Sequence, residues 1–275
     1  MIIRDKFYIN GQWVAPAGTE VLDVVDASSE EVMGRVPAGV VEDANQAVEA
    51  ASAAFENWGM TTPQERQLYL KKLHTAMAAR QDELGAVMAG EVGMPLGMAK
   101  PIQAGLPLQG VANFIKILDT YCFEETIGNS DIIKEPVGVV ACITPWNFPL
   151  HQIMAKVCPA LAAGCTVIVK PSEVAPLTAF MLAEMVEEAG FPPGVVNVVT
   201  GLGPVVGEAL ATHPKVDMVS FTGSNRSPTS MMRCAAPLTT ATLIADKPAP
   251  PTLVCWCLRP NTKGWLKKPL KWRRV

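Results

Sequence analysis

Hydrophobic and polar positions divide the chain into a helical first part and an alternating second part. Between residues 42 and 58 the apolar side chains Ala44, Val48, Ala51 and Phe55 recur at intervals of four, three and four residues. Side chains at this spacing lie on one face of a helix. The pattern therefore predicts an amphipathic helix that packs one face on a core.

A second helix is predicted to begin directly after Thr62. Thr62 is a suitable N-cap, Pro63 suits the first helical position, and Glu65 completes a capping box. Residues 82–89 extend this helix or follow it. A glycine and a proline obscure the start of the next helical stretch, so we expect clear helix only from about Val111.

From residue 132 onward, short apolar runs alternate with amphipathic stretches. Strands are predicted over residues 137–143, 166–170, 195–199 and 217–221, and helices over residues 151–163, 176–189 and 205–211. Continuous apolar strands separated by helices indicate a parallel sheet that is covered on both faces. With right-handed crossovers, this pattern predicts an α/β fold with a Rossmann-like parallel sheet and flanking helices.

The net charge of −3 is the sum of two segments of opposite sign. Residues 1–224 carry 13 Lys and Arg against 25 Asp and Glu, a balance of −12, whereas residues 225–275 carry 10 against one, a balance of +9. Such a break indicates a boundary after Ser224. We therefore expect one folded unit over residues 1–224. Residues 225–275 form a basic, Pro- and Trp-rich segment without a strand pattern, helical at most over 228–236 and disordered elsewhere.

The composition also narrows the class of protein. An apolar fraction of 49% indicates a globular chain, no apolar run is long enough to cross a bilayer, and the N-terminus lacks the apolar core of a secretory signal. The seven cysteines include no C-x-x-C pair and no cluster with histidine that would suit a metal. We expect reduced thiols, a cytoplasmic location, no membrane contact and no metal site.

Polar residues follow two of the predicted strands at their carboxyl ends. Asn147 lies in the turn Pro145-Trp146-Asn147-Phe148-Pro149, and the next strand ends in Lys170-Pro171-Ser172-Glu173. A rigid turn that holds one amide suits a neutral donor aimed at an oxyanion, and open α/β sheets bind ligands at this edge. The alternative interpretation is a proline-braced turn followed by a surface ion pair.

These motifs give the chain a resemblance to a known family. PWNFP at 145–149, KPSE at 170–173, EAGFPPGVVNVVTG at 188–201 and FTGS at 221–224 resemble the aldehyde dehydrogenase superfamily. The segment FYINGQWV at 7–14 is similar to the lead-in of that family. The resemblance runs from about residue 7 to Ser224, and we expect it to stop there.

The resemblance implies NAD(P)-dependent oxidation of a small-molecule aldehyde to a carboxylic acid by a cysteine thiolate and a glutamate. It implies that Asn147 stabilises the oxyanion, and that the cofactor is bound by Ile143, Pro145, Trp146, Lys170, Glu173, Gly203, Phe221, Gly223 and Ser224. A carboxylate at Glu173 suits the ribose hydroxyls and favours NAD, whereas Lys170 could accommodate the phosphate of NADP. The segment Gly201-Leu202-Gly203 taken alone favours a strand-to-helix turn with a positive φ.

Two motifs of the family are not found in the sequence. They are the Leu-Glu-Leu-Gly-Gly type segment with the glutamate and the glycine-flanked cysteine loop. Asp246 falls near the position of the glutamate, but its surroundings do not match, and neither do those of Cys255 and Cys257. We expect Cys142, Cys158 and Cys165 to be buried and inert. Pro228 would disturb a pyrophosphate-binding helix that began at Ser224, unless Ser227 caps a displaced helix.

Three functions stay open at this point. The first is an NAD-dependent aldehyde dehydrogenase represented by its N-terminal half; the second is a catalytically inactive dinucleotide-binding fragment; the third is a basic-tailed interaction protein. We expect no nucleic-acid partner. Residues 125–136 resemble the bridging hairpin of the family. The strand near the family's C-terminus with which it pairs is not found, so we do not expect the family's homo-oligomer. A shifted reading frame or a fused end would explain residues 225–275.

Overall fold

The computed structural model describes residues 1–224, 240–245 and 252–258. Its main sheet has eight strands in the order β12-β13-β11-β8-β9-β10-β2-β3. The centre is parallel and consists of β11 (Met218–Ser224), β8 (Val139–Ile143), β9 (Thr166–Lys170) and β10 (Val196–Val198). β2 (Phe7–Ile9) joins β10 in antiparallel fashion, and β3 (Gln12–Val14) completes that edge. The predicted parallel sheet is thus confirmed.

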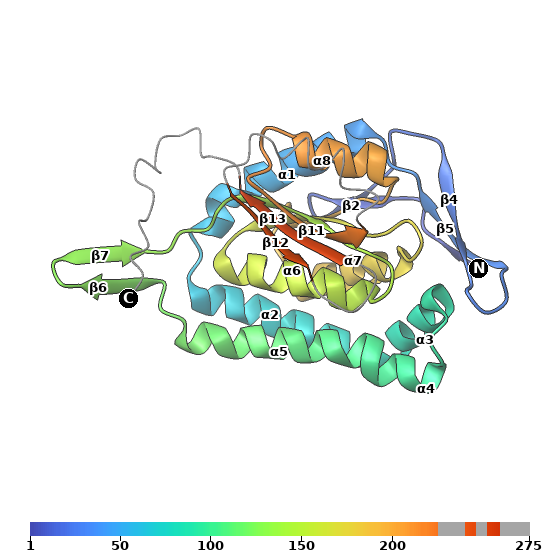
Figure 1. The fold of residues 1–275 in the computed structure, drawn as a ribbon, viewed down its shortest axis with the longest axis horizontal. Coiled ribbons are helices and arrows are strands. Elements are labelled where there is room, and N and C mark those ends of the chain that lie inside the picture. The colour runs from blue at the N-terminus through green and yellow to red at the C-terminus, as the bar shows by residue number, and fades with distance from the viewer. Residues whose placement is uncertain (225–239, 246–251, 259–275) are drawn as a thin grey trace.

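Helices cover both faces of this sheet, as the alternating pattern predicts (Figure 1). On one face lie α1 (Val41–Gly59), the π-helical turn Gly203–Gly207 and α8 (Glu208–Thr212); on the other lie α6 (Pro149–Ala163) and α7 (Leu177–Ala189). A further layer of α2 (Pro63–Ala79), α3 (Gln81–Val92) and α5 (Gly105–Thr120) packs beyond α6 and α7. Side chains of β8, β9 and β10 are buried throughout, which explains why their sequences are predominantly apolar.

The helical first part agrees with its sequence pattern, with one correction. α1 and α2 cover the predicted stretches, and the predicted capping box of Thr62 and Glu65 is present. The expectation that helix becomes clear only near Val111 is wrong. α5 already begins at Gly105 and follows directly on a π-helical turn, Lys100–Ala104, and a short helix α4, Leu96–Ala99. Its proline lies in the first turn of α5, where a missing backbone N–H is best tolerated.

Two small sheets stand apart from the main one. β1 (Ile2–Ile3), β5 (Val32–Pro37) and β4 (Val21–Val25) form one, and β6 (Glu124–Ile127) and β7 (Ser130–Ile133) form an antiparallel hairpin. The hairpin projects from the body of the molecule, with every residue of both strands exposed (Figure 1). Its position agrees with the hairpin that we expected over residues 125–136.

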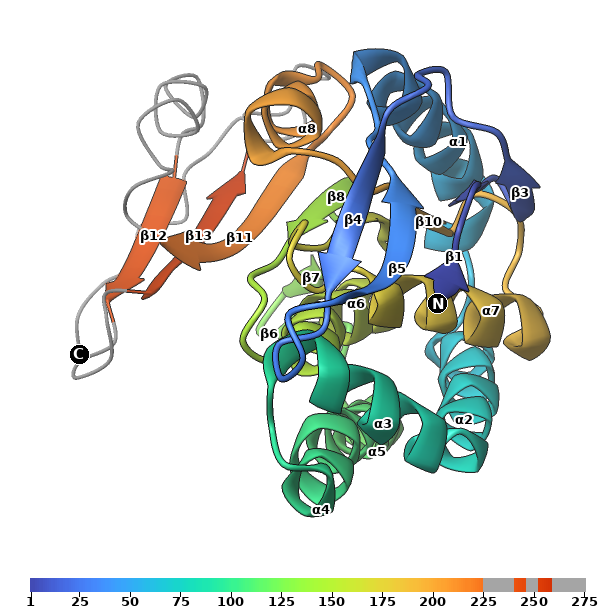
Figure 2. The ribbon, with the colours of Figure 1, turned by 90° about the vertical axis from the view of Figure 1, so that its right-hand side faces the viewer.

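Part of residues 225–275 differs from our expectation that this segment contains no strand. β12 (Thr240–Ala245) and β13 (Thr252–Leu258) pair with each other, and β13 adds to β11 in antiparallel fashion (Figure 2). β11 offers an open row of backbone donors and acceptors, and a run rich in Thr, Val, Leu and Trp suits strand pairing at such an edge. The possible helix over residues 228–236 and the predicted disorder of the other residues lie outside the described residues.

Within the described ranges, no helix combines the length and apolar character that crossing a membrane requires.

Candidate functional site

Three parallel strands end side by side at one edge of the main sheet. Ile143 at the end of β8 lies in register with Lys170 of β9 and with Phe221 of β11. The backbone N–H of Thr144 donates to the carbonyl oxygen of Lys170 at 3.2 Å, so the pairing continues into the loops. This carboxyl edge is where open α/β sheets bind ligands. The polar motifs of the sequence therefore converge in space.

The turn with Asn147 leads from β8 into α6. Trp146 is 50% exposed and Asn147 is exposed, whereas Pro149 is buried at the start of the helix. The backbone carbonyl oxygen of Asn147 accepts a hydrogen bond from Nε2 of Gln103 at 3.1 Å. Asn147 therefore lies at the surface, in the turn that directly precedes a 15-residue helix. A helix N-terminus is a favourable environment for a negative charge.

Lys170 and Glu173 differ from the surface ion pair that we considered as an alternative. Lys170 is only 2% exposed, and its Nζ donates to the carbonyl oxygen of Pro171 at 2.7 Å. Oε2 of Glu173 lies 3.4 Å from the same nitrogen, on a side chain that is 41% exposed. Burial lowers the pKa of the Lys170 ammonium, and the Glu173 carboxylate opposes that shift. A buried ammonium thus lies beneath an accessible carboxylate at this edge of the sheet.

Two glycines follow β10, and packing within the chain requires a glycine only at the first of them. Gly201 has a φ of +150°, and a Cβ there would lie 2.4 Å from Cγ2 of Val206. The positive φ that we expected in this turn is therefore at Gly201. A Cβ on Gly203 would meet no atom within 4 Å. Packing within the chain does not require a glycine at position 203, and a ligand could approach its backbone closely.

The end of β11 lies over a buried cation. Oγ1 of Thr222 accepts a hydrogen bond from Nζ of Lys156 at 2.6 Å, and both side chains are buried. Burial lowers the pKa of Lys156 to about 8. Phe221 is buried too, and its Cζ lies 2.4 Å from the place where a Cβ on Gly223 would be. The ring of Phe221 therefore leaves no room for a larger side chain at position 223.

Comparison with known proteins decides what this arrangement represents. The model of the aldehyde dehydrogenase family matches residues 13–245. The chain belongs to the aldehyde dehydrogenase family. The match continues past Ser224, so our expectation that the resemblance stops there is wrong by about twenty residues, and it includes β12.

Relatives of known sequence agree with this assignment. The chain is 45% identical over 238 residues to 3-succinoylsemialdehyde-pyridine dehydrogenase of a Pseudomonas species. The matched region covers 84% of this chain and 49% of that protein. It is 40% identical over 231 residues to a putative aldehyde dehydrogenase of Staphylococcus aureus, with the same coverage of both chains. The chain therefore spans about half the length of the curated relatives it matches.

Solved structures show the same fold. A cysteine-to-alanine mutant of aldehyde dehydrogenase C from Pseudomonas syringae, in complex with NAD+ and octanal, superposes with a TM-score of 0.83 at 45% identity. That match covers 85% of this chain and 48% of the other. Lactaldehyde dehydrogenase of Escherichia coli gives a TM-score of 0.81 at 35% identity, with 86% and 50% covered. The described fold is thus the cofactor-binding fold of this aldehyde dehydrogenase family.

The structure brings most of the predicted aldehyde dehydrogenase site residues to one edge. They come from the ends of three neighbouring strands: Ile143, Pro145, Trp146 and Asn147 after β8; Lys170 and Glu173 after β9; and Phe221, Gly223 and Ser224 in β11. Gly203 follows β10, the next strand along. The segment 225–239, which would contain any pyrophosphate-binding helix, lies outside the described residues. The roles of all these residues stay predictions.

Two residues of this site were not singled out from the sequence. Lys156 occupies a position between buried residues of α6, and a charge inside an apolar helical run was the signal that could have identified it. Gln103 is fully buried beneath the Asn147 turn. Nothing in its sequence surroundings distinguishes it from an exposed helical glutamine.

The described thiols show the expected burial. Cys142 and Cys158 are fully buried and Cys165 is 2% exposed. Burial raises the pKa of Cys142 to about 12 and also raises the pKa values of the other two. Cys122 is exposed, but it precedes the β6–β7 hairpin and does not belong to the carboxyl edge. Within the described ranges, no group of three or more His, Cys, Asp or Glu side chains could hold a metal ion.

Proposed function

We propose that this chain binds NAD at the carboxyl edge of its parallel sheet and contributes to the oxidation of a small-molecule aldehyde to a carboxylic acid. The observation that carries this proposal is the buried Lys170 ammonium with the accessible Glu173 carboxylate, on the strand next to the one that leads to Asn147. When bound, the nicotinamide accepts a hydride. The chain's own residues bind and orient it.

Lys170 and Glu173 suit the sugar of an adenosine. An ammonium has three donors, and two of those on Lys170 have partners among the described residues, which leaves one for a hydroxyl. The Glu173 carboxylate accepts hydrogen bonds from ribose hydroxyls and repels a phosphate at the same place. This pair favours NAD over NADP. The open approach to Gly203 leaves room for the adenosine beside it.

Asn147 suits a role at the carbonyl group of the aldehyde and not at the adenosine. Its side-chain amide is a neutral donor, it is exposed, and it lies next to the N-terminus of α6. Both the amide and the helix terminus favour a developing negative charge on a carbonyl oxygen. We assign Asn147 as the oxyanion donor.

The same chain offers no matching nucleophile among its described side chains. The three buried thiols are protected from reaction by their raised pKa values, and Cys122 belongs to the base of the hairpin. The family's cysteine and glutamate motifs are not found in the sequence. We therefore propose that the described residues bind the cofactor and hold the oxyanion donor but do not supply the nucleophile, and the inactive dinucleotide-binding fragment stays the alternative.

Titration with NAD, followed by the fluorescence of the tryptophans or by calorimetry, tests the binding proposal. Lys170→Met and Glu173→Gln each remove a charged hydrogen-bond partner, a change typically worth a ten- to hundredfold loss of affinity. Lys215→Met is the control, because Lys215 forms an exposed ion pair with Glu49 outside this edge. The proposal fails if wild-type protein shows no NAD binding at millimolar concentration, or if all three variants bind alike.

A panel of aldehydes with NAD, followed by absorbance of the reduced cofactor, tests turnover. We expect none above the level of buffer. Robust turnover that one cysteine-to-alanine substitution abolishes would contradict the inactive alternative and identify the nucleophile. A nucleic-acid affinity that depends on residues 225–275 would instead support the basic-tailed interaction protein.

A further inference from the structure

A buried amide beneath the Asn147 turn connects the helical layer to the candidate site. Gln103 is 0% exposed, and its Nε2 donates to the backbone carbonyl oxygen of Asn147 across 44 residues of sequence, at 3.1 Å. Asn147 itself is an exposed residue, and the bond from Gln103 engages its backbone and not its side-chain amide. The contact therefore holds the backbone from within and leaves the side-chain amide accessible.

The π-helical turn Lys100–Ala104 brings Gln103 to this position. A π turn closes its hydrogen bonds over five residues and so contains one more residue than an α-helical turn. The side chains before and after it are offset by roughly 100° compared with an uninterrupted helix. The buried residues of this turn are Gln103 and Ala104, and the turn packs against α3, α5 and α6. Single π turns of this kind are frequent at functional sites.

Few other hydrogen bonds are available to fix the backbone of the Asn147 turn. Pro145 and Pro149 have no backbone N–H to donate. Phe148, the N-cap residue of α6, makes no side-chain capping hydrogen bond. A donor from outside the turn is therefore the available way to fix the peptide of Asn147, and Gln103 supplies it.

Stability of the core does not explain a glutamine at this position. Oε1 of Gln103 is buried and has no hydrogen-bond partner among the described residues, and an unpaired buried acceptor costs free energy. Exchanging the two amide atoms would not help, because Oε1 would then face the carbonyl oxygen of Asn147, another acceptor. A methionine or leucine would fill similar space without this cost. The glutamine is explained by the bond that it donates.

We propose that Gln103 is a positioning residue that fixes the Asn147 turn, so that the side-chain amide of Asn147 is aimed in advance at the oxyanion. This inference rests on the proposed function, because the role of Asn147 does. A donor stabilises an oxyanion fully only if it needs no reorganisation during the reaction, and a misplacement of about 1 Å costs on the order of a hundredfold in rate. Mobility of this turn is thus the quantity that Gln103 controls.

Backbone order parameters from ¹⁵N relaxation of the full chain test this proposal without any cofactor. In wild-type protein, the amides of Trp146, Asn147 and Phe148 are expected to show order parameters near 0.85, the value of a rigid backbone. Gln103→Leu and Gln103→Met remove the donor, and we expect these order parameters to fall below about 0.6. The melting temperature should stay the same or rise, which a purely structural role would not produce.

Gln109→Leu is the matched control, since Gln109 lies on α5 with an exposed hydrogen bond to Asn113. Unchanged order at residues 146–148 in both Gln103 variants overturns the proposal. Loss of folding in both also overturns it, because Gln103 would then serve the core and not the turn. Titration of wild-type protein with NAD separates the two hypotheses: absence of binding defeats the proposed function, and unchanged order in a chain that binds NAD defeats only the positioning role.

Discussion

Buried charges in this protein have specific partners, and those of Lys156 and Arg66 join elements that are distant in sequence. Lys156 of α6 donates to Thr222 of β11, and the Lys170 ammonium holds the loop after β9. The guanidinium of Arg66 donates from α2 to the carbonyl oxygen of Ala162 near the end of α6. A charge removed from water must be hydrogen-bonded, so these residues fix the relative positions of the elements that they join.

Glu91 provides a test of pH dependence. It is 2% exposed on α3, and its carboxylate accepts the backbone N–H of Leu177 at 2.6 Å and the hydroxyl of Thr178 at 3.1 Å, at the start of α7. Burial raises the pKa of Glu91 to about 7 against the opposing effect of these hydrogen bonds, whereas its ordinary value is 4.5. The folded protein therefore binds this proton more tightly than the unfolded chain does.

The stabilising contribution of Glu91 is consequently greatest below pH 4.5 and decreases as the pH rises towards 7. The whole change corresponds to about 3 kcal/mol of unfolding free energy. Glu91→Gln cannot titrate, so urea unfolding at pH 5 and pH 8 should show a wild-type advantage that shrinks by an amount of this order at the higher pH. Glu188→Gln, which removes one exposed charge from α7, is the control. An advantage that is equal at both pH values would contradict the prediction.

The candidate site could be predicted from sequence only where local rules apply. Asn147, Lys170 and Glu173 follow apolar runs, and residues after parallel strands meet at one edge. Gln103 contacts the site through a bond that spans 44 residues, and no local pattern encodes such a contact. Sequence reasoning therefore identified the residues of the loops and missed the residue beneath them.

At the scale of elements, agreement depends on whether the determining interactions are local. The predicted and observed ranges of β9 coincide at residues 166–170, because Gly164 ends the preceding helix in a left-handed conformation and Pro171 follows the strand. The π-helical turn Lys100–Ala104 was not foreseen, since its register depends on packing against α3 and α6. The strands β12 and β13 were missed for a related reason: pairing with the edge of β11 is a tertiary interaction.

The capping box of α2 yields a prediction for an element. The backbone N–H of Glu65 donates to Oγ1 of Thr62 at 3.2 Å, and the Glu65 carboxylate accepts the N–H of Thr62 at 2.7 Å. Thr62→Ala leaves the first donor unpaired and should cost about 1 kcal/mol, or roughly 2–4 °C in melting temperature. Thr75→Ala makes the same deletion on an exposed position of this helix and should cost nothing, because alanine is the better helix former. Equal losses in the two variants would argue against capping as the cause.

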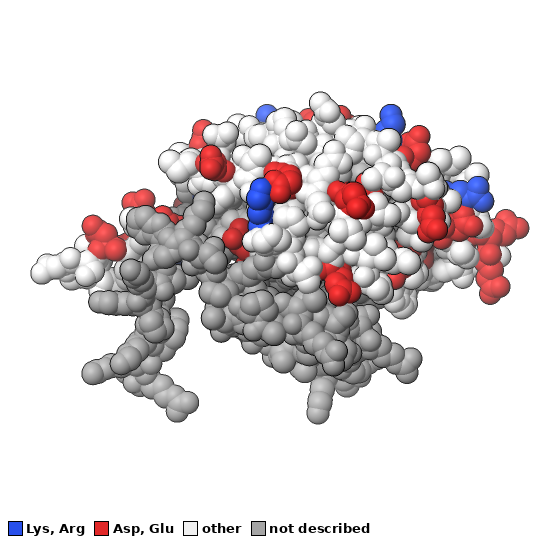
Figure 3. Space-filling view, turned by 90° about the horizontal axis from the view of Figure 1, so that it is seen from above, with Lys and Arg blue, Asp and Glu red and all other residues white. Residues whose placement is uncertain are grey.

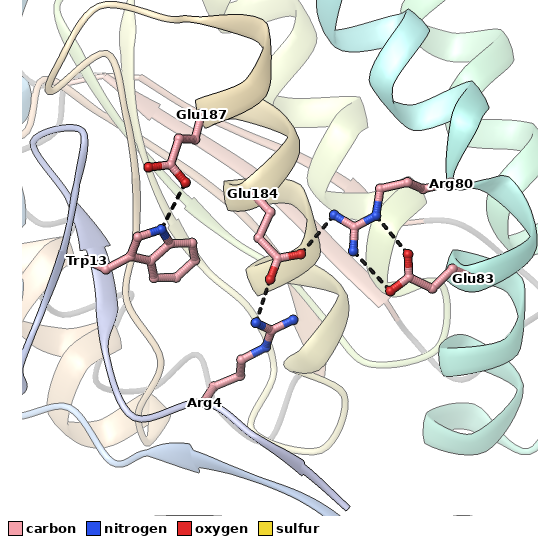
Figure 4. A network of polar contacts seen from close by, with 6 residues as sticks. All are labelled: Arg4, Trp13, Arg80, Glu83, Glu184 and Glu187. Carbon is pink, nitrogen blue, oxygen red and sulfur yellow. Dashed lines mark hydrogen bonds and ion pairs between the residues drawn. The ribbon is translucent and has the colours of Figure 1, made fainter.

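At the scale of the whole molecule, an ionic network joins three layers. Glu184 of α7 contacts Arg4, which follows β1, at 2.5 Å and Arg80, between α2 and α3, at 2.8 Å (Figure 4). Arg80 also binds Glu83 through two hydrogen bonds, which raise the pKa of Arg80. Figure 4 shows both guanidinium groups pointing at the single Glu184 carboxylate. The segment after β1, helix α7 and the junction of α2 and α3 are thus connected at one residue.

Residues 1–224 are predominantly acidic, and this excess of negative charge affects how the stability of the Glu184 network depends on salt. Acidic side chains are spread across the face shown in Figure 3, with few basic ones between them. Residues 1–224 carry a balance of −12, from 13 basic and 25 acidic residues. Repulsion among these charges is weakened by salt, whereas a partly buried network loses less of its attraction.

Glu184→Gln should therefore destabilise the protein more than the loss of an ordinary surface pair. Arg4 and Arg80 would be left adjacent without a shared anion, so two partly buried ion pairs are lost together, whereas an exposed pair is worth about 0–1 kcal/mol. Asp23→Asn, which breaks the exposed pair of Asp23 with Arg35, is the control. Urea unfolding at 0.05 M and 0.5 M salt measures both. The idea that Glu184 ties the layers together fails if the two substitutions cost the same at both salt concentrations, because Glu184 would then act as one more surface charge.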